Sequence, residues 1–305
     1  MRTNSGLRGV YSPVVTPFDA TLEPDSWLFV RHCRWLAEQG VGLAVFGTNS
    51  EANSMSVGEK IDLLDALLDA GIPAERLLPG TGCCALPDSV RLTHHAVKHG
   101  TPAVLMLPPF FYKNVSDDGL FANYAELIQR VADDRLRIYL YHIPQVSQVS
   151  FSLSLIERLL AAYPQTIAGV KDSSGDWSNT QAMITEFAAD GFSVFAGREP
   201  FLLQTMRAGG AGCITATGNV NPAAIMRLYQ SWQDEDADAQ QSALNAVRGI
   251  FQEFPMIPAL KAAIAHYGAN PDWRRVRPPL VALSQAQQHS LAERLTAHGF
   301  SMPGL

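Results

Sequence analysis

The stretch Ile167-Ala-Gly-Val-Lys171, followed by Asp172-Ser-Ser-Gly-Asp176, is one example of a pattern that repeats along this chain. Its first four residues are apolar or small, which is typical of a buried β-strand, and a lysine ends the run. Turn-forming polar residues come next, and a segment of helical periodicity follows them. The stretch therefore predicts one strand–turn–helix unit with a lysine at the carboxyl end of its strand.

The same alternation of short β-rich runs and longer helical segments recurs from residue 9 to about 233. Eight such runs occur, at 9–16, 43–47, 76–80, 103–107, 137–143, 167–171, 192–196 and 213–215. Ser56-Val-Gly-Glu59 matches a capping box ahead of one helix, and Asn221-Pro222 places a proline at the start of another. Eight strand–helix units of this size predict an α/β fold, a (β/α)8 TIM barrel.

After the eighth unit the pattern is helical throughout. Helices are predicted over 239–254, 256–266 and 284–298, separated by Pro255 and by a turn-rich stretch at 271–279. We therefore predict a catalytic barrel domain over residues 1–233 and a C-terminal three-helix extension over 234–305. The extension is either a small appended domain or an oligomer contact.

Composition excludes several classes of protein. The chain has 305 residues, of which 47% are hydrophobic and 17% charged, with a formal net charge of -6. It carries no Lys/Arg-rich run, which argues against nucleic acid and anionic membranes as partners. No apolar run approaches the length of about 18 residues that a spanning helix needs, and Met1–Leu7 lacks the apolar core of a signal peptide. We expect a cytoplasmic protein with reduced cysteines at 33, 83, 84 and 213, since these lack C-x-x-C spacing.

Chemistry in such a barrel gathers at the carboxyl ends of the strands. Lys171 ends the sixth run, and Tyr141 lies near the end of the fifth. Side chains alternate along a strand, so Tyr139 and Tyr141 share one face, and Gly169 and Lys171 share one face of theirs. If both faces are the lumen, a phenol and an amine meet at the barrel mouth. For a lone lysine, the alternative is a buried stem whose ammonium reaches water.

The second run ends in Gly47-Thr-Asn-Ser-Glu51, a loop of small hydroxyl and amide residues. Such a loop can offer backbone N–H groups and hydroxyls to a carboxylate. Together with Tyr141-His-Ile-Pro144 and Gly169-Val-Lys-Asp172, it resembles the G-[TS]-[TN]-G-E, Y-N-x-P and G-x-K motifs of one superfamily. This is the dihydrodipicolinate synthase and N-acetylneuraminate lyase superfamily of pyruvate-dependent class I aldolases. The resemblance covers nearly the whole chain and includes Val14–Phe18 and Gly212–Thr215.

The resemblance implies a mechanism without metal or separate cofactor. Lys171 would form a Schiff base with pyruvate or another 2-keto acid, and that imine would act as an electron sink. Tyr141 would shuttle protons, and Thr48 would join it in catalysis. Substrate-binding positions carried over from the resemblance are Asn49, Ser50, Ser173, Ile214 and Arg198. The family implies a homotetramer, which the aromatic loop Phe110-Phe-Tyr112 also favours.

Three positions depart from the family pattern. Val146 replaces the arginine with which the synthases bind a distal carboxylate, which argues against true dihydrodipicolinate synthase activity. After the fourth predicted strand the segment differs in length from that of the synthases, so that either Tyr112 supplies their proton relay or Phe111 leaves the relay empty. Ser50 replaces a glycine and adds a hydroxyl. At their positions, Asn49 and Ser173 resemble the residues of hydroxy-oxoglutarate aldolases and keto-sugar-acid enzymes of the superfamily more than those of the synthases. Both residues also suit ordinary turns.

Several alternatives stay open. Arg198 either binds an anionic substrate tail or decorates the start of a helix. His94, His95 and His99 have helical spacing that suits a metal, but a solvated helix face is the simpler interpretation. Three functions remain: a lyase or aldolase acting on a 2-keto acid, a keto-deoxy-sugar-acid dehydratase using the same imine, and a keto-acid-binding barrel without turnover.

Overall fold

A computed structural model of the protein describes residues 6–305. Its contacts divide into two compact units. The first unit comprises Pro73–Ile214 together with the residues up to Gly9, and the second comprises Val10–Ile72 and Thr215–Leu305. Most of the segment used to argue against a signal peptide, residues 1–5, lies outside the described residues.

The first unit contains five parallel strands that pair in chain order. They are β3 (Val104–Met106), β4 (Ile138–His142), β5 (Ile167–Asp172), β6 (Ser193–Ala196) and β7 (Gly212–Ile214). Every residue of β3, β4, β6 and β7 is buried. Burial on both faces is typical of parallel strands that helices cover.

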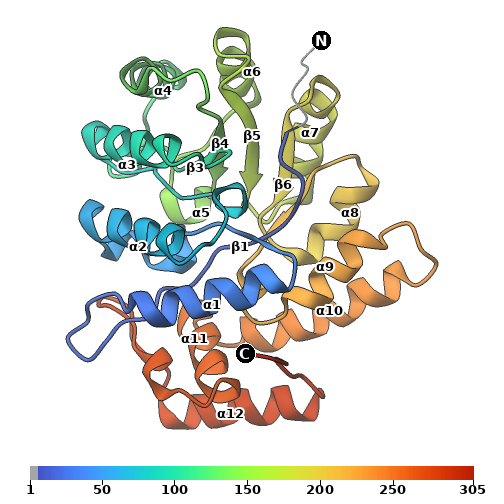
Figure 1. Ribbon diagram of the computed structural model, residues 1–305. Coiled ribbons are helices and arrows are strands. Elements are labelled where there is room, and N and C mark those ends of the chain that lie inside the picture. The colour runs from blue at the N-terminus through green and yellow to red at the C-terminus, as the bar shows by residue number, and fades with distance from the viewer. Residues whose placement is uncertain (1–5) are drawn as a thin grey trace. The chain divides into compact units, whose positions relative to one another are not determined.

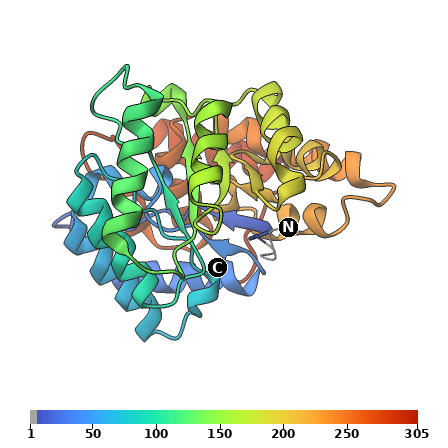
Figure 2. The same cartoon turned by 90° about the horizontal axis from the view of Figure 1, so that it is seen from above.

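Helices alternate with these strands. They are α3 (Leu86–Lys98), α4 (Asp117–Val131), the short α5 (Pro144–Ser147), α6 (Leu153–Ala162), α7 (Trp177–Phe187) and α8 (Leu202–Arg207). Figure 1 shows α3, α4, α6 and α7 arranged along strands β3 to β6. Figure 2, seen from above, shows α4 and α6 side by side. The first unit therefore repeats the predicted strand–helix alternation.

The third predicted strand, 76–80, is not formed as a strand. Arg76 ends a 3-10 helix, Ala74–Arg76, and Gly80 makes only an isolated parallel bridge with Leu105. Backbone hydrogen bonds join Leu105 N–H to Pro79 O at 2.9 Å and Thr81 N–H to Leu105 O at 3.0 Å. Pro79 has no N–H to donate, so the ladder cannot continue through it. The segment therefore lies beside β3 without forming a regular strand.

The second unit contains the strands β1 (Gly9–Ser12) and β2 (Gly42–Leu43), which pair in parallel. Its helices are α1 (Ser26–Glu38), α2 (Val57–Asp69), α9 (Pro222–Gln230), α10 (Ala237–Gln252), α11 (Met256–Tyr267) and α12 (Gln285–Ala297). The capping box predicted at the start of α2 is confirmed, since Ser56 Oγ accepts from Glu59 N–H and Glu59 accepts from Ser56 N–H. Pro222 is the first residue of α9, as predicted.

The α/β class is therefore confirmed, with parallel strands that alternate with helices. Seven of the eight predicted runs contain a strand within the described residues. A closed eight-stranded barrel and a domain boundary at residue 233 stay predictions. The three predicted C-terminal helices are present as α10, α11 and α12, in the same unit as residues 10–72.

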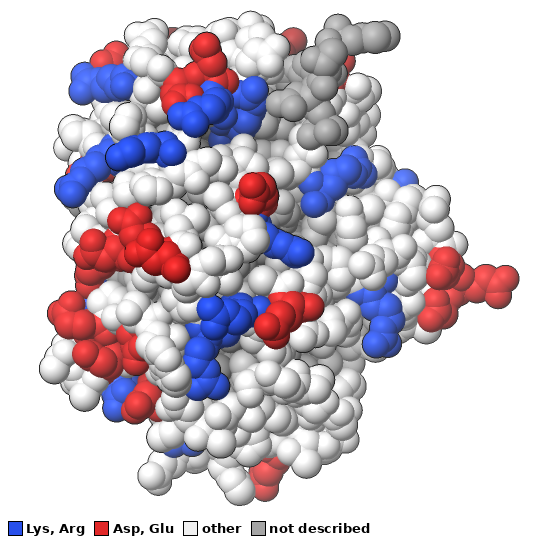
Figure 3. Space-filling model, in the orientation of Figure 1, with Lys and Arg blue, Asp and Glu red and all other residues white. Residues whose placement is uncertain are grey.

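The charges on one face, the cysteines and the hydropathy of the helices bear on the compositional analysis. Acidic and basic side chains are mixed on the face shown in Figure 3. All four cysteines are free. In the part of the chain that the structure describes, no helix has the length and apolarity needed to cross a membrane.

Candidate active site

Lys171 and Tyr141 lie together at the carboxyl ends of two neighbouring strands. Tyr141 of β4 pairs in register with Lys171 of β5. The lysine Nζ lies 4.2 Å from the centroid of the tyrosine ring. Only 2% of Lys171 and 3% of Tyr141 are exposed. The strand alternation thus correctly predicts that the amine and the aromatic ring meet, and the amine does not reach out into solvent.

A glycine makes room beneath this pair. Gly169 pairs with Tyr139, two residues below the register pair Tyr141 and Lys171. A Cβ at Gly169 would lie 2.4 Å from both Ser193 O and the Tyr139 ring. No side chain fits there, so the glycine allows the Tyr139 ring to pack across β5.

Asp172 ties the end of β5 to the start of α7. It is 2% exposed, and its carboxylate accepts four hydrogen bonds. The donors are Ser174 N–H at 2.9 Å, Ser174 Oγ at 3.0 Å, Asn179 Nδ2 at 3.1 Å and Thr180 Oγ1 at 2.6 Å. These bonds satisfy the buried carboxylate and fix the backbone next to Lys171.

His142 pairs in register with Asp172, next to the Tyr141–Lys171 pair. Its Nδ1 accepts a hydrogen bond from Phe151 N–H at 3.1 Å, so the proton of the neutral ring is on Nε2. Burial lowers the pKa of His142, and the Asp172 carboxylate offsets part of that effect. His142 is 4% exposed and belongs to the buried support of the site.

Strand β7 adds a buried thiol, Cys213, that interacts electrostatically with Lys171. Burial raises the pKa of Cys213, the Glu199 carboxylate raises it further, and the Lys171 ammonium lowers it. Glu199 is 1% exposed. Ile214, a predicted substrate contact, is also buried on β7. The lysine therefore lies within a buried group that also contains a carboxylate, which the sequence analysis did not assign to the site.

Ser173 and Arg198 lie on the loops that follow β5 and β6. Ser173 is buried, and its N–H donates to His142 O at 2.7 Å. Arg198 is half-buried, with Cζ 5.9 Å from the centroid of the Phe201 ring. A Cβ at Gly175, whose φ is +79°, would lie 2.6 Å from an Arg198 nitrogen. The guanidinium therefore packs over the turn that follows Lys171.

Tyr112 is not part of this buried group. It is 75% exposed and packs edge-on against Phe111, with ring centroids 5.4 Å apart. Val146, at the position of the expected arginine, is 59% exposed. Its apolar side chain offers no charge to a distal carboxylate.

In the second unit, the loop after β2 forms a compact turn. Thr48–Ser50 is a 3-10 helix, in which Thr48 and Asn49 are half-buried and Ser50 is buried. The Ser50 hydroxyl accepts from Gly47 N–H at 3.1 Å, and Ser50 O accepts from Thr16 Oγ1 at 2.8 Å. The serine that replaces the family glycine thus closes its own turn.

The residue after this turn forms a buried ion pair that the sequence analysis missed. Glu51 Oε1 lies 2.7 Å from Lys261 Nζ on α11, and neither side chain is exposed. Glu51 Oε2 accepts from Arg277 N–H at 2.8 Å. The sequence does contain a signal for such a pair, namely the single lysine in the apolar segment 256–266, because a buried lysine needs a charged partner.

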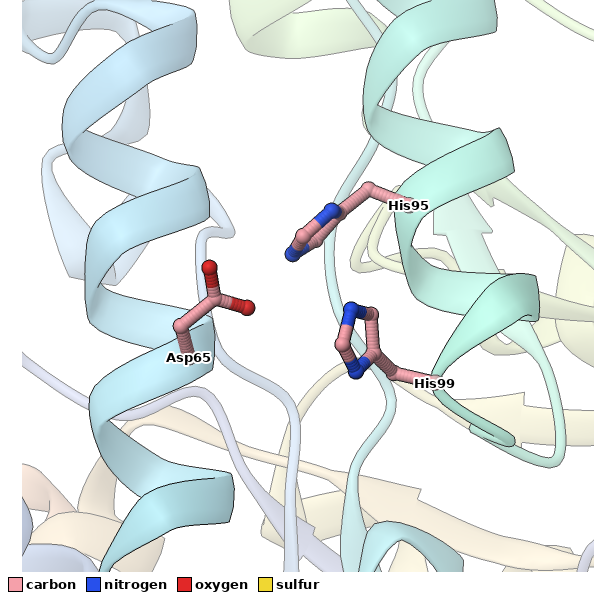
Figure 4. A group of neighbouring side chains, drawn as sticks. All are labelled: Asp65, His95 and His99. Atoms are coloured by element: carbon pink, nitrogen blue, oxygen red, sulfur yellow. The ribbon is translucent and has the colours of Figure 1, made fainter.

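The histidines of α3 lie mostly at the surface. His94 and His99 are exposed, and His95 is half-buried. Figure 4 shows His95 and His99 on neighbouring turns, and their ring centroids are 4.5 Å apart. Asp65, also labelled there, belongs to α2 of the second unit. The exposure of His94 and His99 agrees with a solvated helix face.

Comparison with known proteins identifies the family of the chain. The family model described as "Dihydrodipicolinate synthetase family" matches residues 6–298. The chain belongs to this family. An uncharacterised DapA-like lyase of Chloroflexus aurantiacus is 33% identical over 287 residues, which cover 93% of this chain and 94% of the relative.

Solved structures of the dihydrodipicolinate synthetase family resemble the chain closely. The crystal structure of dihydrodipicolinate synthase from Agrobacterium tumefaciens has a TM-score of 0.87 and 30% identity, covering 95% of this chain and 98% of its own. YagE of Escherichia coli, solved in complex with pyruvate, has a TM-score of 0.86 and 25% identity, covering 96% and 99%. The resemblance derived from the three motifs is confirmed.

Proposed function

We propose that the protein is a class I carbon–carbon lyase that forms a Schiff base between Lys171 and pyruvate or a pyruvate-derived 2-keto acid. The observation that carries the proposal is the buried lysine at the end of β5, against the Tyr141 ring of β4. Membership of the dihydrodipicolinate synthetase family and a pyruvate-bound neighbour in that family support it.

The reaction begins when the neutral Lys171 amine attacks C2 of the keto acid. The carbinolamine loses its oxygen as water, and a protonated imine remains. In the cleavage direction, the C4 hydroxyl loses its proton, the C3–C4 bond breaks, and its electron pair moves into the imine as an enamine. The aldehyde leaves, C3 takes up a proton, and water releases pyruvate and restores the amine. Synthesis follows the same steps in reverse.

We assign the proton transfers of this cycle to Tyr141. Tyr141 is the residue of β4 that pairs in register with Lys171, and its phenol can release and take up a proton. Thr48 and Asn49 are proposed to hold the carboxylate of the keto acid, because their turn offers hydroxyl, amide and backbone N–H groups.

The second half of the substrate is proposed to be a neutral or hydroxylated aldehyde. Val146 offers no charge to a distal carboxylate, which supports an aldolase reaction over dihydrodipicolinate synthesis. Ser173, Ile214 and Arg198 are proposed contacts to this half. A homotetramer, a cytoplasmic location, and a relay role for Tyr112 stay predictions.

Borohydride trapping tests the proposal. The protein is incubated with pyruvate, reduced with borohydride, digested, and mapped by peptide mass spectrometry. We expect one pyruvate-derived adduct on Lys171, absent in Lys171→Ala and unchanged in Lys98→Ala, which alters an exposed lysine of α3. Wild-type protein without an adduct on Lys171 would exclude both the lyase and the dehydratase functions.

Product analysis separates these two functions. A panel of 4-hydroxy-2-keto acids and 2-keto-3-deoxy acids is incubated with the protein, and the products are identified. A lyase releases pyruvate and an aldehyde. A dehydratase releases water and keeps the carbon chain intact.

A further inference from the structure

We infer that Lys261 of α11 is a positioning residue for the turn Thr48–Ser50, and that it acts through its buried ion pair with Glu51. The inference rests on the proposed function, in which this turn holds the carboxylate of the keto acid. It gives α11 a specific task, the orientation of a substrate-binding turn in the same unit.

The contacts form a continuous path from the helix to the turn. Lys261 Nζ contacts Glu51 Oε1 at 2.7 Å, and Glu51 N–H donates to Thr48 O at 3.1 Å. Glu51 has a φ of 58°, in the left-handed region that a residue with a side chain rarely adopts. Such a conformation persists only where its surroundings hold it in place. The ion pair to α11 and the Arg277 N–H bond are the contacts that fix this side chain.

Further groups enclose the pair from both sides of the turn. The Phe18 ring lies 4.6 Å from Lys261 Nζ and 4.7 Å from Arg277 Cζ. The Arg277 guanidinium donates to Leu22 O at 2.7 Å and to Ser54 O at 2.8 Å, and it pairs with Glu59. The turn is thereby anchored at residues that precede and follow it in the chain.

Stability alone is a poor explanation for this arrangement. A buried ion pair contributes little net stability, because desolvation of two charges offsets their attraction, and a well-packed apolar pair often serves as well. Its bonds are directional, however, and an apolar pair could not supply an acceptor for Arg277 N–H. A pair of this kind is therefore better suited to fixing an orientation than to holding two elements together.

The pair also has a defined pH range. Burial lowers the pKa of Lys261 to about 8, and the attraction of Glu51 offsets part of that effect. The charged groups around it are Glu51 from the turn and Arg277 from the C-terminal segment, and Glu59 and Glu23 pair with the outer side of Arg277. We therefore expect Lys261 to be a cation at pH 7 and to lose its charge, and with it the ion pair, as the pH rises above about 8.

Lys261→Met tests the inference with two independent readouts, and Arg294→Gln is its control. The methionine keeps an unbranched side chain and removes the charge. The control removes an exposed pair with Glu253, 2.7 Å apart, in the same unit. The first readout is amide hydrogen exchange of the peptide 47–55 without ligand, which reports the hydrogen bonds of the turn directly.

The second readout is the pyruvate concentration that gives half-maximal borohydride trapping. At pH 7 we expect Lys261→Met to raise this concentration about tenfold or more. The trapping rate at saturating pyruvate should stay within about threefold of wild type, because the reacting groups are untouched. The ratio of variant to wild type should fall toward one by pH 9.5, since the wild-type lysine is then neutral as well. A purely structural role would not give this pH dependence.

The outcomes separate the inference from the proposed function. Faster exchange of 47–55 in Lys261→Met but not in Arg294→Gln supports the positioning role, even if wild-type protein forms no adduct. Exchange and half-saturation equal to those of the control overturn it. If Lys261→Met does not fold, Glu51→Gln replaces it, because that amide keeps the shape and removes the charge. Glu51→Gln should then accelerate exchange of the same peptide, and unaltered exchange would overturn the inference.

Discussion

Lys171 and Tyr141 show how far a two-residue alternation can predict which side chains lie together. The sequence places both at strand ends, and the parallel register then brings the amine to 4.2 Å from the ring centroid. The motif also correctly indicates a turn after the strand, although β5 extends one residue beyond the predicted run, to Asp172, and the turn begins at Ser173. It does not indicate that the carboxylate of Asp172 accepts from four donors. Three of them are side-chain groups, one from Ser174 in the turn and two from Asn179 and Thr180 of α7, and their rotamers depend on packing.

Replacement of Tyr141 by phenylalanine is expected to leave the fold intact and slow the chemistry. The ring stays against Lys171, while the hydroxyl is lost. A proton-transfer group typically contributes about 10²–10⁴-fold to a rate. The trapping rate constant and the turnover number should fall within that range, and the melting temperature should change little. A variant as active as wild type would remove Tyr141 from the proton transfers.

Gly169 is predicted to tolerate no side chain. Gly169→Ala would place a methyl group 2.4 Å from Ser193 O and from the Tyr139 ring, so β5 or the ring must move. We expect a loss of about 1–3 kcal/mol or more in the free energy of unfolding, measured by urea denaturation. Gly249→Ala is the matched control, since a Cβ there meets no atom within 4 Å and the site is in α10. Alanine should stabilise that helix by about 0.5–1 kcal/mol.

At the scale of elements, most helices and strands follow from periodicity and end signals, and the exceptions have physical causes. The run 76–80 has strand-like composition, but Pro79 interrupts the hydrogen-bond ladder. The helix 256–266 is predicted correctly as α11, whereas the partner of its lysine is not. Lys261 and Glu51 are 210 residues apart in the chain, and no local pattern relates them.

We expect the hydrogen bonds of Asp172, between β5 and α7, to affect the reactivity of Lys171 more than the stability of α7 does. Asp172→Asn replaces an acceptor-only carboxylate by an amide whose NH₂ group faces hydrogen-bond donors. We expect a loss of about 1–3 kcal/mol in the free energy of unfolding, because buried polar groups lose their partners, together with slower trapping at Lys171.

Asp176→Asn is the control for this variant. Asp176 caps α7 by accepting from Ser178 N–H at 2.9 Å, and asparagine is also a good N-cap. Stability and trapping should therefore stay close to wild type. If Asp176→Asn slowed trapping as much as Asp172→Asn did, the effect would belong to the helix and not to the strand end.

For the molecule as a whole, acid sensitivity has an identifiable source in the second unit. His32 on α1 is 2% exposed and lies between Trp35 and Trp273, with ring centroids 5.6 Å and 5.1 Å away. Among the described residues, neither of its ring nitrogens has a hydrogen-bond partner within bonding distance. Burial lowers the pKa of His32 to about 4, and neighbouring Asn219 offsets only part of that shift.

The sign of the pH effect follows from this shift. The unfolded chain binds a proton at His32 near pH 6.5, whereas the folded protein does so only near pH 4. Acid therefore favours unfolding between these values, and the stability lost is on the order of 3 kcal/mol. We expect urea midpoints of the wild-type protein to fall more steeply from pH 6.5 to 4.5 than those of His32→Phe, which has no titrating ring. His289→Gln, a change at an exposed position, should follow wild type, and equal slopes for all three proteins would exclude His32 as the source.

The packing around Lys171 divides its neighbourhood into positions that cannot vary and positions that can. Gly169 is constrained by close contacts and Asp172 by four hydrogen bonds, so substitutions at these two positions are expected to lower the stability of most library members. Arg198 and Val146 are at least partly exposed and do not hold the strand in place. Directed evolution toward a new aldehyde acceptor should therefore concentrate its diversity at Arg198 and Val146 and leave the strand itself unchanged.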